Sequence, residues 1–182
     1  MQPLPEKLQD FRYFLIVTWR HLKLPDPTPV QLDIAEYLQH GERRKILQGF
    51  RGVGKSWITS TYVVWKLRID PQLKFLVVSA SKNRADDFTT FTMRLINEMP
   101  VLAPLIPQEH QRNSKISFDV APATASHSPS VTSRGVLSQM AGSRADEIIA
   151  DDVEVPNNSY TQPMRDKPVS YTHLTLPTNR EV

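Results

Sequence analysis

The sequence predicts an α/β fold in which a mostly parallel sheet is flanked by helices. Candidate strands and helices alternate from about residue 45 onward, an order typical of parallel sheets covered on both faces. Residues 73–80, LKFLVVSA, are rich in branched apolar side chains, as buried parallel strands are. A glycine-rich turn, QGFRGVGKS at residues 48–56, lies between a candidate strand and a strongly apolar helix.

Two amphipathic helices are expected before the sheet. Apolar residues spaced by three and four predict the first over about residues 5–22, and the run KLPDPTP ends it. Thr28 and Pro29 suit the N-cap and first position of a second helix that ends at Gly41. The residues expected on its buried face are Val30, Ile34 and Leu38.

The remaining elements follow in order, with no repeat or linker that would divide the chain into two domains. Helices are expected over about residues 55–69 and 84–99, the latter ended by Pro100. A Ser/Thr/Pro/Ala-rich loop is expected around residues 121–129. The expected strands are KILQ (45–48), LKFLVVSA (73–80), KISFDV (115–120), SVTSRGVL (130–137) and EIIAD (147–151).

Composition excludes several kinds of site. The chain has no cysteine, so disulfides and thiolate metal sites are excluded, and its 5 histidines show no pair at helical ligand spacing. The net charge of +3 permits contact with nucleic acid without arguing for it. No run of apolar residues is long enough for a membrane span, so a soluble, intracellular protein is expected.

The turn matches G-x-x-x-x-G-K-S, the Walker A pattern of phosphate-binding loops. Its glycines permit backbone angles that turn N–H groups toward a phosphate, and the next helix directs its positive end there. Lys55 would reach the β and γ phosphates of ATP, and Ser56 would ligate Mg²⁺. The alternative is a glycine-rich turn with a solvated lysine. The residues expected around the nucleotide are Gly49, Arg51, Gly52, Val53, Gly54, Lys55, Ser56 and Trp57.

Arg51 lies inside this turn. An arginine there can sense the γ phosphate or neutralise charge in the transition state of phosphoryl transfer. The alternative is an exposed arginine that binds nothing. Its position favours the functional interpretation.

The run EIIADDVE supplies the carboxylates that such a loop needs. Residues 148–150 are expected to form a short buried strand with Asp151 at its carboxyl end as the metal-side acid. Successive side chains of an extended chain point in opposite directions, so Asp152 is our first candidate for general base or water-positioning residue, and Glu154 the second. Aspartate is one methylene shorter than the usual glutamate. The alternative is an acidic strand end in solvent.

Two polar residues, Gln31 and Arg144, each have two possible roles. The amide of Gln31 can pair with an adenine edge, yet Thr28-x-x-Gln31 is also a capping box, and the residues alone favour neither. Arg144 precedes the acidic strand and could act across a subunit boundary, or it could be an ordinary surface arginine.

Five segments together resemble the N-terminal ATPase part of the large terminase subunit, or DNA maturase B, of short-tailed, podovirus-type phages. They are PTPVQ, QGFRGVGKS, LKFLVVSASKNRAD, SHSPSV and GSRADEIIADDVEVP, and the resemblance covers about residues 4–165. The Walker A pattern is shared by very many NTPases. Its combination with SASK and GSRADEIIADDVE is far more specific.

The resemblance implies an ATP-hydrolysing, Mg²⁺-dependent motor that moves double-stranded DNA into procapsids in the host cytoplasm. It implies a homo-oligomeric ring at the portal, with a small terminase subunit as a further partner and no membrane. Asp151 and Asp152 fall in the family's Walker B region, Arg144 at a trans-acting arginine, and Gln31 at the adenine side, which favours its functional assignment. Alternatives are a helicase-like ATPase and a nucleotide-binding regulatory module without turnover.

The last residues are expected to be non-native. VSYTHLTLPT, residues 169–178, looks like the translation of a sequencing-library adapter; the alternative is a natural polar tail. Residues 1–167 would then be the N-terminal part of a P-loop ATPase domain, truncated after Walker B and lacking the coupling segment and the nuclease. We expect this fragment to be inactive alone and poorly folded, because the sheet would lack its central strand.

Overall fold

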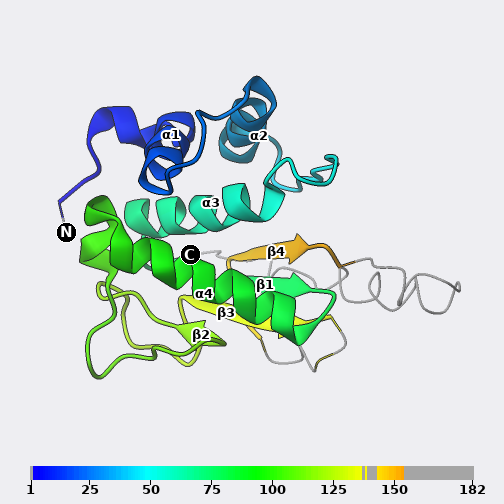
Figure 1. Cartoon of the computed structure of the whole chain (residues 1–182). Coiled ribbons are helices and arrows are strands. Elements are labelled where there is room, and N and C mark those ends of the chain that lie inside the picture. Colours follow the sequence, from blue (N-terminus) through cyan, green and yellow to red (C-terminus); the bar gives the residue numbers. More distant parts are fainter. Residues whose placement is uncertain (1, 137, 139–142, 154–182) are drawn as a thin grey trace, which may run out of the picture.

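The computed structural model describes residues 2–136, 138 and 143–153 (Figure 1). None of the helices in these ranges has the length and apolar character needed to cross a membrane. The elements, in order, are η1 (Glu6–Gln9), α1 (Phe11–His21), α2 (Pro29–His40), α3 (Lys55–Ile69), β1 (Phe75–Ser79), α4 (Lys82–Glu98), η2 (Pro100–Leu105), β2 (Ser117–Phe118), β3 (Val131–Gly135) and β4 (Glu147–Asp151).

The four strands form one sheet in the order β2-β3-β1-β4. β1 pairs in parallel with both neighbours, so that Val77 lies opposite Ser133 on β3 and Ile149 on β4. The short strand β2 is antiparallel to β3. The predicted α/β class with a mostly parallel sheet is therefore confirmed. Parallel pairing also brings the carboxyl ends of β1, β3 and β4 to the same edge.

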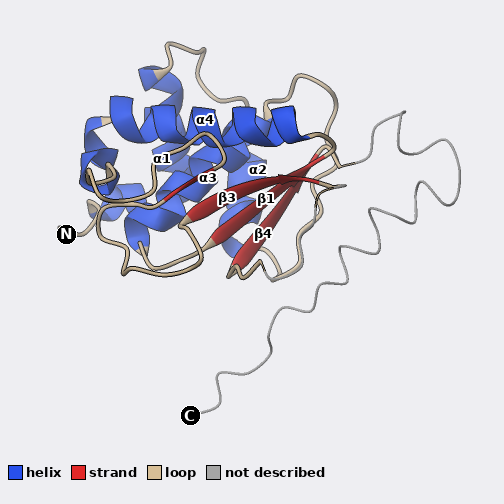
Figure 2. Ribbon diagram, turned by 90° about the horizontal axis from the view of Figure 1, so that it is seen from below, coloured by secondary structure: helices blue, strands red, loops and turns tan. Residues whose placement is uncertain are grey.

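The described helices lie on one face of the sheet (Figure 2). Phe75 and Val77 of β1 belong to the main core, which they share with the helices. Leu76 and Val78 point to the other face and form a small separate cluster with Val136. Helices on both faces were expected, and in the described residues this is wrong: the part of the β3–β4 connection that the structure describes contains no helix that could cover the second face.

The first two helices differ from the prediction in one boundary and in one buried face. The expected helix over residues 5–22 divides at Asp10, because the Asp10 carboxylate accepts a hydrogen bond from the backbone N–H of Arg12 at 2.9 Å and caps α1. The second helix has the predicted start and end. Its buried face is narrower than expected, since Leu38 is buried whereas Val30 beside the capped end is 48% exposed.

Two predicted strands are wrong in part. Residues 45–48 form no strand, because none of the described strands supplies hydrogen-bond partners, and Ile46 is 80% exposed. The strand expected at 147–151 has the predicted bounds, but it was expected to be buried. Among the described strands β4 pairs only with β1, so it is an edge strand and Ile148 is 42% exposed.

Candidate functional site

The glycine-rich turn leads directly into α3. Gly52 and Gly54 have φ angles of 93° and 86°, a region that side chains disfavour, and Gly54 is the N-cap of the helix. Gly49 was also expected to adopt a backbone conformation that is closed to other residues, but its φ is not positive. A Cβ on Gly49 would lie 3.1 Å from Cγ1 of Val53, so close packing is what restricts this position. Val53 itself is buried.

The two cations of the turn differ in their contacts. The ammonium group of Lys55 donates a hydrogen bond to the backbone carbonyl of Gly49 at 3.0 Å, so its side chain folds back over the turn. Arg51 is exposed and makes no hydrogen bond or ion pair with any residue that the structure describes. Both side chains line the same pocket. Both cations are therefore placed to meet an anion entering it.

Gln31 links α2 to the turn. Its Oε1 accepts a hydrogen bond from the backbone N–H of Thr28 at 2.9 Å, and the Thr28 hydroxyl accepts one from the N–H of Gln31, which completes the capping box. Its Nε2 donates to the backbone carbonyl of Val53 at 2.9 Å. The capping assignment is thus observed directly. The amide also fixes the start of α2 to the glycine-rich turn.

Asp151 meets Ser56 across the structure. Its Oδ2 accepts a hydrogen bond from the Ser56 hydroxyl at 2.8 Å, although the two residues are 95 positions apart. The hydroxyl of Ser79, at the end of β1, donates to the backbone carbonyl of Asp151 at 2.7 Å. Burial raises the pKa of the Asp151 carboxyl, against the opposing effect of the Ser56 hydrogen bond. The site thus holds a partly desolvated acid beside a hydroxyl.

Asp152 turns away from this contact. Its φ is 47°, uncommon for a residue other than glycine, and its Oδ2 lies 3.4 Å from Nη1 of Arg84 in the first turn of α4. Arg84 was not among the predicted site residues. The signal was present, because parallel β1 and β4 must end at the same edge and α4 starts three residues after β1.

A pocket of about 530 Å³ is lined by Gln31, Arg51, Lys55, Ser56 and Asp152, whereas Asp151 is not among its lining residues. One wall is the turn and the start of α3, including Trp57, whose ring stacks on Phe91 at 5.4 Å between centroids. The other wall was not predicted; it comes from Trp19 of α1 and from Leu24, Pro25 and Asp26 of the α1–α2 connection.

Gly49, Val53 and Arg144 were predicted for this site, but they are not among the residues that line the pocket. Arg144 is exposed and precedes the amino end of β4, whereas Asp151 lies at the carboxyl end. A strand of this length separates the two by roughly 15 Å at 3.3 Å per residue. Glu154 lies outside the described residues, as does the segment 168–182 that was expected to be non-native.

No protein-family model matches the chain. Over 159 residues, 87% of its length, it is 56% identical to the terminase large subunit of Enterobacteria phage T3, a podovirus. The chain spans 27% of the length of that relative. The predicted resemblance to large terminase subunits is thereby confirmed over the segment that the two proteins share.

Proposed function

From this likeness to a terminase large subunit, we propose that the segment is the nucleotide-binding part of an ATP-hydrolysing motor that packages double-stranded viral DNA. One observation carries the proposal. Ser56 at the start of α3 and Asp151 at the end of β4 are in contact beside a pocket that Arg51 and Lys55 also line. This is the combination that phosphoryl transfer requires: a phosphate-binding turn, cations, and a carboxylate for a metal.

The triphosphate would bind at the turn. The free N–H groups at the start of α3 and the helix dipole favour an anion at that point. Lys55 would exchange its bond to the Gly49 carbonyl for bonds to the β and γ phosphates. Arg51, which has no partner among the described residues, would neutralise charge that develops on the γ phosphate.

The oxygen pair formed by Ser56 and Asp151 suits Mg²⁺. This cation prefers oxygen ligands and takes one or two from protein when phosphates and water complete its shell. Bound there, Mg²⁺ would offset the charge of the β and γ phosphates.

Asp152 would act on the attacking water. It lines the pocket, and its side chain is separate from the Ser56–Asp151 contact. In the hydrolysis step, water oxygen bonds to the γ phosphorus while the bond from that phosphorus to the β–γ bridging oxygen breaks. The electron pair leaves with ADP, and the water proton passes to the Asp152 carboxylate. Glu154 remains the second candidate for this role.

The nucleobase would lie against the α1–α2 connection. Trp19, Leu24 and Pro25 give that wall of the pocket an apolar surface, which suits the face of a purine. Gln31 would contribute there with the amide hydrogen that its capping and Val53 bonds leave unused. We therefore retain Gln31 as a base contact secondary to its role at the helix start.

The remaining assignments rest on the likeness to the terminase large subunit. A complete protein of this kind would work in the host cytoplasm as a homo-oligomeric ring at the procapsid portal, with double-stranded DNA and a small terminase subunit as partners. A nuclease would follow the ATPase part. Arg144, remote from its own subunit's pocket, would act as a trans arginine on a neighbouring subunit's nucleotide.

Lysine 55 provides the first test. In a full-length terminase large subunit that contains this segment, Lys55→Ala should weaken Mg·ATP binding at least tenfold, measured by isothermal titration calorimetry, because it removes the ammonium that would bind the β and γ phosphates. Lys115→Ala is the matched control, since Lys115 is an exposed lysine outside the pocket. Undiminished binding by the Lys55 variant would contradict the proposal.

A further inference from the structure

We infer that Arg84 is a positioning residue for Asp152. The inference rests on the proposed ATPase function, because Asp152 is the residue assigned there to the attacking water. Arg84 is absent from the pocket lining, so its effect would pass through Asp152 and not through contact with the nucleotide.

The contact links the first turn of α4 to the residue that follows β4. Arg84 and Asp152 are 68 residues apart, and Nη1 of Arg84 lies 3.4 Å from Oδ2 of Asp152. The guanidinium engages Oδ2, while Oδ1 has no hydrogen-bond partner among the described residues. One carboxylate oxygen is thus held by a cation and the other is left to accept a proton from water.

The base of Arg84 is itself fixed in place. The Ser81 hydroxyl caps α4 by accepting a hydrogen bond from the backbone N–H of Arg84. At the end of β3, a Cβ on Gly135 would come within 2.9 Å of the backbone nitrogen of Lys82. Cap and close packing together set the first turn of α4 against the carboxyl ends of the strands, where Asp152 lies.

Stability does not account for this pair. The side chains of Arg84 and Asp152 are 53% and 57% exposed, and exposed ion pairs contribute little to folding. Asp152 nevertheless has a left-handed backbone, a conformation that is retained when the surroundings determine it. By contrast, Arg94 on the same helix pairs with Glu98 one turn away, an ordinary surface pair.

The test is steady-state ATP hydrolysis by the full-length protein. Arg84→Gln should lower kcat about tenfold and leave KM for ATP within about twofold, because misplacing a proton acceptor slows the chemical step without removing a nucleotide contact. Arg84→Lys, which keeps the charge but not the planar fork, should recover part of the loss. Arg94→Gln is the matched control and should leave both constants unchanged.

A double variant separates this role from an independent one. In an Asp152→Asn background, Arg84→Gln should cause no further loss of kcat, since its effect passes through the Asp152 carboxylate. Equal losses in both backgrounds, an unchanged kcat, or a loss confined to KM would each overturn the inference even if Lys55→Ala weakened Mg·ATP binding as expected. If the wild-type protein neither binds nor hydrolyses ATP, the proposed function fails, and the inference fails with it.

Discussion

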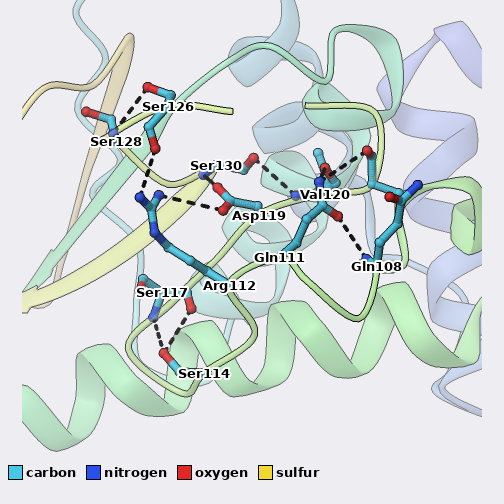
Figure 3. Close-up of polar contacts among 11 residues, drawn as sticks. Gln108, Gln111, Arg112, Ser114, Ser117, Asp119, Val120, Ser126, Ser128 and Ser130 are labelled. Atoms are coloured by element: carbon cyan, nitrogen blue, oxygen red, sulfur yellow. Dashed lines mark hydrogen bonds and ion pairs between the residues drawn. The ribbon is translucent and has the colours of Figure 1, made fainter. Parts of the chain in front are cut away.

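The two edges of the parallel sheet contrast in how they use their polar groups. At the carboxyl edge, Arg51 has no partner among the described residues, Arg84 and Asp152 are paired but half exposed, and a pocket opens beside them. At the amino edge, many polar groups of the segment between η2 and β3 bond to one another (Figure 3).

Arg112 and Asp119 are central to that second network. Arg112 donates to the backbone carbonyl of Ser126 at 2.8 Å and lies 3.6 Å from the Asp119 carboxylate. Asp119 in turn accepts from the backbone N–H of Ser130 at 3.1 Å, and Ser130 accepts from the N–H of Val120. This loop was expected from its Ser, Thr, Pro and Ala content; the network that closes it was not.

This contrast separates the structural from the functional polar groups of the molecule. At the amino edge, donors and acceptors are consumed within the fold, so their removal should cost stability. At the carboxyl edge, charges face a pocket and an uncommon backbone conformation is kept, so their removal should cost function more than stability. Both edges contain Asp and Arg, and residue type alone does not distinguish them.

The largest effect is expected at Asp152. In the full-length protein, Asp152→Asn should lower kcat for ATP hydrolysis by about 10²–10⁴, the range for loss of a positioned proton acceptor. Binding of Mg·ATP should stay close to that of the wild type. Steady-state ATP hydrolysis checks the first expectation, and a binding measurement with Mg·ATP checks the second. Retained turnover would move the water-positioning role to Glu154.

A moderate effect is expected at Arg112. Arg112→Ala removes the bond to the Ser126 carbonyl and the pairing with Asp119, and should lower the free energy of unfolding by about 1–2 kcal/mol. ATP turnover at a temperature where the protein is folded should not change. Arg94→Ala, which breaks only a surface pair, should cost about 0.5 kcal/mol or less. Chemical denaturation compares the free energies of unfolding of the two variants. Loss of turnover in a folded Arg112 variant would contradict a purely structural role for this residue.

The smallest effect is expected at Lys74, and it depends on pH. Its ammonium nitrogen is buried without a hydrogen-bond partner in the described residues, and burial lowers the pKa of Lys74 from its ordinary value of 10.5, opposed by Asp119 and Asp146. Between the lowered value and 10.5 the unfolded chain binds more protons, so this residue makes stability rise with pH.

Lys74→Met should therefore raise the melting temperature near neutral pH, because it removes the cost of burying the charge. The gain should shrink as the pH approaches 10.5, the ordinary value for this group. Calorimetric scans of both proteins from pH 7 to about 10 check this. A gain that is the same at every pH would mean that packing, and not the charge, causes it.

Much of the local structure could be predicted because the determinants lie within a few residues. Thr28 and Pro29 specify the start of α2 through a cap and a fixed φ, and the glycines before Lys55 specify the turn. The end of β4 at Asp151 was also predictable from EIIADD. Asp10 was missed because its cap interrupts an apolar periodicity that continues across it.

The positions of the glycine-rich turn, its lysine and the acidic strand end follow from the local sequence, since each depends on neighbouring residues. The contact between Arg84 and Asp152, the pocket wall from the α1–α2 connection and the lack of a strand partner for residues 45–48 depend on how the whole chain folds. Those outcomes depend on the strand order and on the face that each helix covers. Such long-range choices follow from burial of the whole core, which no local pattern records.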